Sequence, residues 1–300
     1  MSLREWSLLL SLSILWGGSF FFAKIAVAEL GPLTVVLGRV ALAAFCLNAV
    51  LAFSRRSLAR PGTPWRAFFA MGALNNLVPF ALIFWAQLHI ASGLASILNA
   101  TTPLFTVIVA HLFTSDERMT GGKVVGVLAG LTGVAVLIGL DALQAIDAGV
   151  WGELACLGAA LSYAFAGVYG RRFKAMKVAP LEAAAGQVTA TSILIVPIVL
   201  VFEPPWSAVA WPGPETWGAL IGLAVLSTAL AYVLYFRILA MAGATNLLLV
   251  TFLIPVTAIV LGTAFLGERL EMRHAAGMVL IALGLAAIDG RIATAIRPAK

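Results

Sequence analysis

The sequence predicts an all-α membrane protein with ten transmembrane helices, arranged as two inverted five-helix repeats around a central cavity. Composition is the first indication: 62% of the 300 residues are hydrophobic and only 11% are charged, with a mean hydropathy of +1.03. A soluble domain is about a quarter charged, so polar residues are too few here to cover a water-exposed surface. The net charge of +6 therefore needs no nucleic-acid partner to explain it; the partner that composition requires is a lipid bilayer.

Ten apolar stretches, each near the roughly 20 residues that a membrane-spanning helix needs, follow one another along the chain. They cover residues 6–28, 33–53, 65–88, 91–113, 121–140, 150–171, 180–202, 215–238, 243–266 and 273–290. The first stretch lacks a clear cleavage site, so we interpret it as a retained helix rather than a signal peptide. The connections are short and leave no room for a second, soluble domain.

An internal repeat divides the chain into residues 1–149 and 150–300. The spacing from Glu117 to Gly126 is nine positions, and so is the spacing from Glu268 to Gly277. Further matched positions lie upstream at offsets of 147 to 152 residues. Because each half contributes five helices, an odd number, the second half enters the membrane from the opposite side. The two halves are therefore expected to be inverted repeats, which suits a carrier that opens to each side in turn.

Basic residues predict the orientation of the helices. With both termini on one side, that side receives 15 of the 19 Lys and Arg residues, and the opposite side receives three. The 15 residues are Arg4, Arg55, Arg56, Arg60, Arg66, Arg118, Lys123, Arg171, Arg172, Lys174, Lys177, Arg237, Arg291, Arg297 and Lys300. Because cytoplasmic loops are enriched in Lys and Arg, we expect both termini to be cytoplasmic.

Specific residues then point to a family. Each half has a proline in the middle of its fourth helix, Pro103 or Pro255, followed by a Glu-Arg pair at the end of that helix. Together with Asn75 and Asn76, this pattern resembles the EamA-type transporters of the drug/metabolite transporter superfamily, over nearly the whole chain. It looks closest to the ten-helix bacterial exporters of amino acids and related metabolites, aromatic amino acid exporters among them.

The resemblance implies a multi-pass carrier of the bacterial inner membrane that exports small organic solutes, with amino acids as the expected substrates. Alternating access through a central midplane cavity is the implied mechanism. Export of drugs or other metabolites in the same fold, and a passive channel, are the alternatives. An enzyme is not expected, since no nucleophile–base pair and no HExxH-like spacing lies at one depth.

Polar and aromatic residues near the middle of the predicted helices are the candidates for substrate binding, because such groups are costly in lipid unless they are paired or face water. They are Trp16, Ser19, Lys24, Asn75, Asn76, Asn99, Thr102, Tyr163, Ser227, Thr228 and Thr251. Hydrogen bonding between helices is the competing role for each Ser and Thr. Pro79, Pro103 and Pro255 are candidate kinks or gates, and the prolines at 103 and 255 free backbone carbonyls that a substrate ammonium could use.

Two cations lie within predicted helices. Lys24 either extends to the membrane surface or binds a substrate carboxylate. Arg39 is seven residues inside its helix, and we expect it to anchor to backbone carbonyls or to Glu29. Gln187 occupies the position of Arg39 in the second half, so no symmetric arginine role is expected.

The remaining expectations concern coupling, metals and assembly. No acidic residue lies at a predicted midplane, so the sequence does not establish proton antiport. Two isolated cysteines, and histidines near helix ends, predict neither a metal site nor a cofactor. Glycines at 122, 126, 130 and 133, and at 277 and 284, predict that the fifth and tenth helices pack together. We favour a monomer, with homodimerisation as the competing use of these glycines.

Overall fold

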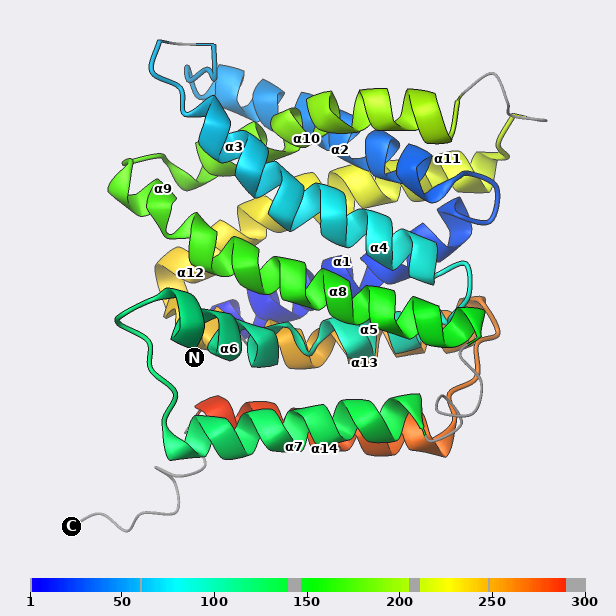
Figure 1. Cartoon of the computed structure of the whole chain (residues 1–300). Helices are drawn as coiled ribbons and strands as arrows, with labels where there is room; N and C mark the ends of the chain where they lie inside the picture. The colour runs from blue at the N-terminus through cyan, green and yellow to red at the C-terminus, as the bar shows by residue number, and fades with distance from the viewer. Residues whose placement is uncertain (1, 60, 140–146, 205–210, 248, 290–300) are drawn as a thin grey trace.

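The computed structural model describes residues 2–59, 61–139, 147–204, 211–247 and 249–289. Within these ranges the regular structure is entirely helical, and the helices run back and forth across the molecule (Figure 1). Eight helical segments are long and apolar enough to cross a membrane, and two shorter apolar helices complete a set of ten among the described residues. The predicted fold class is confirmed.

Five helical passes make up each half. The first half contains α1 (Leu3–Ala26), α2 (Pro32–Phe53), a third pass of α3 (Trp65–Gly72), η1 (Ala73–Leu77) and α4 (Val78–Ala86), a fourth pass of α5 (Ser92–Asn99) and α6 (Thr102–Phe113), and α7 (Gly121–Ile138). The second half contains α8 (Ala148–Gly170) with the short α9 (Arg172–Ala175), α10 (Pro180–Phe202), an eighth pass of α11 (Pro214–Ile221), η4 (Gly222–Leu230) and the part of α12 (Ala231–Leu247) that precedes the non-helical Gly243, then α13 (Val250–Phe265) and α14 (Met272–Asp289).

The fourth pass is broken where proline removes a backbone donor. Pro103 has no N–H, so the carbonyl of Asn99 loses its helical partner. The Thr102 hydroxyl takes that place and donates to the Asn99 carbonyl at 2.7 Å. In the second half, by contrast, Pro255 lies inside the continuous helix α13. The helix is therefore interrupted at Pro103 and not at Pro255, its equivalent in the second half.

The helix ends form two faces, at the left and right of Figure 1. We call the left one the basic face; it carries the N-terminus of α1 and the connections at 54–64, 114–120 and 171–179. We call the right one the acidic face; it carries the connections at 27–31, 87–91 and 266–271, with the described ends of the 203–213 connection. Four of the predicted basic-side residues, Arg60, Arg291, Arg297 and Lys300, lie outside the described residues.

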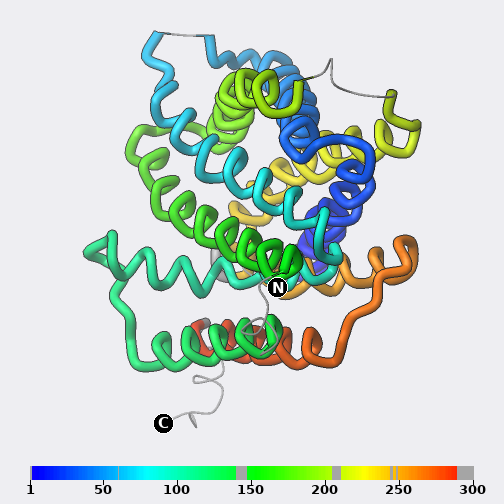
Figure 2. Tube along the Cα trace, turned by 45° about the vertical axis from the view of Figure 1, so that its right-hand side comes forward, coloured from blue at the N-terminus to red at the C-terminus, as the bar shows by residue number. Residues whose placement is uncertain are grey.

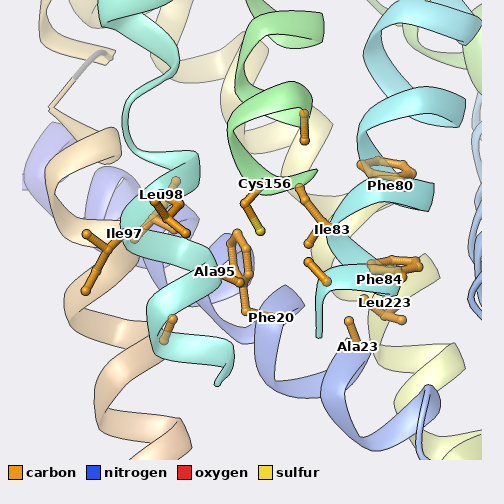
Figure 3. Packing of buried hydrophobic residues seen from close by; sticks show 14 of the residues in the cluster. Phe20, Ala23, Phe80, Ile83, Phe84, Ala95, Ile97, Leu98, Cys156 and Leu223 are labelled. Atoms are coloured by element: carbon orange, nitrogen blue, oxygen red, sulfur yellow. The ribbon is translucent and has the colours of Figure 1, made fainter. Parts of the chain in front are cut away.

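Helices from the two halves interleave rather than forming separate bodies. Helix α1 packs against α13, α2 against α10 and η4, and α4 against α8. Figure 3 shows the resulting core, where Phe20 of α1, Phe84 of α4, Cys156 of α8 and Leu223 of η4 lie among one another, all of them buried. Because these contacts cross between the halves, the core of the protein is built by both repeats.

Helices α7 and α14 lie side by side beneath the other helices in both views (Figures 1 and 2). Glycines allow the close approach: a methyl group on Gly126 would lie 2.6 Å from the Gly284 carbonyl oxygen, and one on Gly133 would lie 2.8 Å from the Gly277 carbonyl oxygen. Since Gly126 corresponds to Gly277 in the repeat, the two contacts are exchanged by a twofold axis. The predicted pairing is confirmed, whereas Gly122 has open space around it and takes no part.

We expect Gly133→Ala to destabilise the protein by about 1–3 kcal/mol, because the added methyl group has no space between the two backbones. Gly122→Ala is the matched control. It makes the same chemical change in the same helix, where no atom lies within 4 Å, and should be neutral or slightly stabilising. Thermal unfolding in detergent measures both. Equal melting temperatures for the two variants would contradict the glycine contact.

Candidate functional site

Two matched stretches of widened helix lie in the middle of the third and eighth passes. Segments η1 and η4 are π-helical, with an extra residue per turn, and single π turns within α-helices often mark functional sites. Asn75 and Asn76 lie in η1, and Ser227 and Thr228 occupy the equivalent positions of η4. The polar pairs that the repeat predicts at matching depth therefore both fall on distorted backbone.

The widened turns have identifiable causes and partners. Pro79 is the second residue of α4, which directly follows η1, and a wider preceding turn moves the backbone away from the proline ring. The carbonyl of Leu74, within η1, accepts a hydrogen bond from the Ser162 hydroxyl of α8 at 2.7 Å. In η4 the Thr228 hydroxyl donates to the Leu223 carbonyl at 2.8 Å. Side chains thus satisfy carbonyls that the irregular backbone leaves open.

A hydrogen-bonded polar cluster surrounds η1. Asn75 Nδ2 donates to Gln187 Oε1 at 2.9 Å, and Asn76 Nδ2 donates to the Thr191 hydroxyl at 3.3 Å. The hydroxyl of Tyr232 lies 3.3 Å from the amide nitrogens of both Asn75 and Gln187, and it donates to Asn76 Oδ1 at 3.4 Å. Tyr232 of α12 therefore joins amides from the two halves; the sequence suggests it as a possible pocket aromatic, but it is not among the predicted substrate-binding residues.

A second polar cluster surrounds η4 and contains a buried cation. Arg39, 6% exposed, donates from Nε to the Thr228 hydroxyl at 2.9 Å and from Nη1 to the Ser19 hydroxyl at 3.1 Å. Its guanidinium carbon lies 3.8 Å from the ring centre of Phe80. The expected anchoring to carbonyls or Glu29 is wrong, because Arg39 bonds to hydroxyls and the Glu29 carboxylate is bound to Gly213 and Thr216.

The two clusters are related by the repeat. Arg39 in α2 meets η4 of the other half, and Gln187 in α10 meets η1 of the other half. The equivalent positions of Arg39 and Gln187 were visible in the sequence, and this match was the signal that could have identified both as site residues. One cluster carries a charge, and the other has neutral amides in its place.

Aromatic residues lie on the helices that carry or adjoin the two clusters. Tyr163 of α8 and Tyr232 of α12 are both half-buried. Trp16, also partly accessible, lies 5.7 Å from Tyr235 between ring centres. These rings give the polar clusters an apolar border.

The remaining candidates lie elsewhere. Thr251 and Pro255 line a small apolar pocket with Ile97, Ala100 and Met278, between the fourth, ninth and tenth passes. Asn99 and Thr102 flank the break in the fourth pass, and Asn99 Oδ1 is enclosed with no hydrogen-bond partner among the described residues. The structure therefore brings Ser19, Asn75, Asn76 and Thr228 into the two clusters, and it does not bring Thr251 to them. Ser227 is next to Thr228, but its hydroxyl is buried and makes no hydrogen bond to a described residue.

Lys24 is held by backbone carbonyls at the acidic face. Its ammonium donates to the carbonyls of Gln87 and Ile90, just beyond the last residue of α4. A cation at this position complements the negative end of the helix dipole. The contacts therefore give Lys24 a helix-capping role, and they give no support to the predicted binding of a substrate carboxylate.

Three glutamates close the acidic face by bonding across the two halves. Glu203, after α10, accepts from Leu33 and Thr34 at the start of α2. Glu268, after α13, accepts from the backbone of Ser92 and Gly93 and from the Ser92 hydroxyl at the start of α5.

Glu29, after α1, accepts from Thr216 and Gly213 at the start of α11, and these bonds hold the pKa of its carboxyl below the ordinary value. The lowered pKa keeps this contact charged at neutral pH, and the contact is lost only as the pH falls through that lowered value. Each of the three carboxylates thus caps a helix N-terminus that belongs to the opposite half.

At the basic face the corresponding glutamate has a different partner. Glu117, which matches Glu268 in the repeat, forms an ion pair with Arg171. Arg171 also pairs with Asp116, at 3.0 Å. The side chains of Glu117 and Arg171 are both exposed, so the ion pair between them contributes little to the stability of the protein. The two faces are therefore held differently although the repeats that form them are alike.

Removing the Tyr232 hydroxyl tests the cluster around η1. We expect Tyr232→Phe to destabilise the protein by about 1–3 kcal/mol, because three amides, two of them buried, lose a common partner. Tyr235→Phe is the matched control, since Tyr235 contributes ring contacts and its hydroxyl has no recorded hydrogen bond among the described residues. Thermal unfolding of the two purified variants in detergent gives the comparison, and equal stability would contradict the cluster.

The chain is similar to known proteins over most of its length. The chain matches the EamA-like transporter family twice, over residues 4–139 and 150–288. It is 26% identical to the "Uncharacterized transporter YoaV" of Bacillus subtilis (strain 168), covering 92% of this chain and 94% of that protein. It is 28% identical to the "Uncharacterized inner membrane transporter YedA" of Escherichia coli (strain K12), covering 92% and 88%.

Two further similar proteins are one whose name states an activity and one whose structure has been solved. A "Probable amino-acid metabolite efflux pump" of Escherichia coli (strain K12) is 26% identical, covering 95% of this chain and 94% of that one. A solved crystal structure superposes with a TM-score of 0.68 at 22% identity, covering 95% of this chain and 97% of that one. At that identity the superposition speaks for the fold alone.

Proposed function

Because the chain belongs to the EamA-like transporter family, we propose that this membrane transporter exports small organic solutes, and amino acids in particular, by alternating access. Members of the family are transporters and not enzymes, and the multi-pass fold fits a lipid bilayer. In the proposed orientation the basic face and both termini are cytoplasmic, and the acidic face is external. We propose the inner membrane as the location, as in the YedA relative.

The observation that carries this proposal is the difference between the two faces. Glu203, Glu268 and Glu29 cap helices across the halves at the acidic face, and Glu117 at the basic face pairs with Arg171 instead. We interpret this arrangement as a carrier closed on the outside. In the opposite state, Glu117 would cap the start of the ninth pass, as Glu268 caps the start of the fourth. Inverted repeats allow such an exchange without any new contact type.

Amino acids are the proposed substrates for two reasons. Hydroxyl and amide groups from both halves meet near the middle of the helices, where polar groups are costly unless they pair or contact a polar solute. Aromatic rings border them and would accommodate an apolar side chain. The name of the E. coli efflux pump supports the same class. The predicted contacts of Trp16 and Tyr163 with the substrate side chain are part of this proposal.

Counterflow in proteoliposomes tests the transport proposal. Vesicles are loaded with an unlabelled amino acid and diluted into a trace of the same labelled amino acid, across the twenty standard amino acids. A carrier should accumulate label transiently to several times its equilibrium level, because the unlabelled solute leaving the vesicle returns binding sites that then carry label inward.

Empty vesicles and vesicles diluted without internal substrate are the controls. Label that only equilibrates, and at a rate that does not saturate with concentration, would establish a passive channel instead. Repeating the assay with an imposed pH gradient determines whether a proton is coupled to transport.

A disulfide across the acidic face tests alternating access. We expect Ser92→Cys with Glu268→Cys, in a chain whose Cys46 and Cys156 are replaced by Ala, to lose counterflow on oxidation and regain it on reduction. The Ser92 and Glu268 side chains are in direct contact, with oxygens 2.8 Å apart, so a disulfide would lock this contact closed.

Ser92→Cys with Glu271→Cys is the matched control, because Glu271 lies in the same connection and pairs with Arg273. Counterflow that continues in the oxidised 92–268 pair, with disulfide formation verified by mass spectrometry, would contradict opening at this contact.

A further inference from the structure

We propose that the Arg39 guanidinium binds the carboxylate group of the transported solute. The inference rests on the proposed transport function and adds a residue to it, since the sequence predicted only a structural anchor at this position. The ligand class that it names is an organic acid or a zwitterion with a free carboxylate.

The charge of Arg39 is not neutralised within the described part of the chain. The side chain is buried at 6% exposure, and its recorded partners are two hydroxyls and two aromatic rings, all of them neutral. The acidic residue considered as a partner, Glu29, is committed to the start of α11. A cation at depth in a membrane protein requires an anion or water. A bound carboxylate would supply that anion.

Arg39 also has N–H donors that make no hydrogen bond to a described residue. A guanidinium carries five N–H donors. Nε and Nη1 each make one hydrogen bond, to Thr228 and Ser19. Nη2 has no partner among the described residues, and it is not one of the enclosed atoms without a partner, so it keeps contact with accessible space. The Nη1–Nη2 edge can therefore present two parallel donors, which is the geometry that a carboxylate accepts.

The surroundings hold the guanidinium in place without consuming its charge. Phe80 lies beneath it at 3.8 Å, and Phe84, one turn further along α4, stacks on Phe80 with ring centres 6.0 Å apart. Figure 3 shows both rings on the same side of α4. A ring face attracts a cation but does not neutralise it. With the plane fixed by Phe80 and two hydroxyls, Arg39 is preorganised for a ligand, which reduces the entropy lost on binding.

Nearby groups extend the site. Tyr163 of α8 keeps accessible surface and makes no hydrogen bond to another described residue, so its hydroxyl is available to a bound solute. Trp16 lies three residues before Ser19, on the same side of α1, and brings an aromatic surface towards the carboxylate site. Gln187, the repeat equivalent of Arg39, is already bonded to Asn75 and Tyr232. The proposed anion site is therefore at Arg39 and has no equivalent at Gln187.

The first experiment measures anion binding without any assumption about transport. Purified full-length protein in detergent is heated with benzoate or with benzamide at constant ionic strength; the two probes differ only in the carboxylate. We expect benzoate to raise the melting temperature of the wild type, with an apparent affinity at least tenfold above that of benzamide. In Arg39→Gln this preference should fall below threefold, and in Arg39→Lys it should be intermediate, since the charge stays and the fork is lost.

The stability of the variants without ligand separates binding from a purely structural role. If Arg39 only ties helices together, Arg39→Gln should melt well below the wild type. If it is a ligand-binding cation, removal of an unpaired buried charge should leave the melting temperature equal or higher. Arg118→Gln, at an exposed arginine, is the control and should change neither stability nor probe preference.

Counterflow with L-phenylalanine and L-phenylalaninamide as competitors completes the test. Benzoate preference in the wild type with no amino acid exchange would refute the proposed substrate while supporting Arg39 as a carboxylate site. Amino acid exchange that persists in Arg39→Gln with its preference for acid over amide would overturn the Arg39 inference and leave the transport proposal intact. Equal benzoate and benzamide effects in the wild type would also overturn it.

Discussion

A polar group in the hydrocarbon core of a membrane must find its partner within the protein, and this constraint organises the whole molecule. The π-helical segments η1 and η4 disturb the backbone at mid-membrane depth, and hydroxyls such as that of Ser162 restore the hydrogen bonds there. The amides of Asn75 and Gln187 satisfy each other across the two halves. Irregular backbone and polar side chains thus stabilise one another where the repeats meet.

The two halves have matching folds but differ in the charged residues at equivalent positions. The glycine contacts of α7 and α14 obey the twofold relation closely, and so do the positions of η1 and η4. The residues that carry charge do not: Arg39 is matched by Gln187, and the partners of Glu268 and Glu117 differ. Packing contacts recur in both repeats because both must close the same bundle, whereas the charged residues and their partners differ between the two faces.

The sequence predicted the helices and the glycine pairing well, since both depend on hydropathy or on spacing within one segment. It did not predict the π segments, because one extra residue in a turn leaves the apolar pattern almost unchanged. Partners that come from the opposite half, such as Tyr232 for Asn76 or Glu203 for Thr34, were also missed. Which helices interleave is a property of the assembled bundle. Lys24 was misleading for the same reason, since its carbonyl partners lie at the end of another pass.

The mutual glycine contact between α7 and α14 has a consequence for the origin of the chain. Gly126 lies against Gly284, which is about two turns along α14 from Gly277, the counterpart of Gly126, so the same surface meets itself in the inverted orientation. A single ancestral five-helix unit, inserted into the bilayer in both directions, would already have possessed this self-complementary seam.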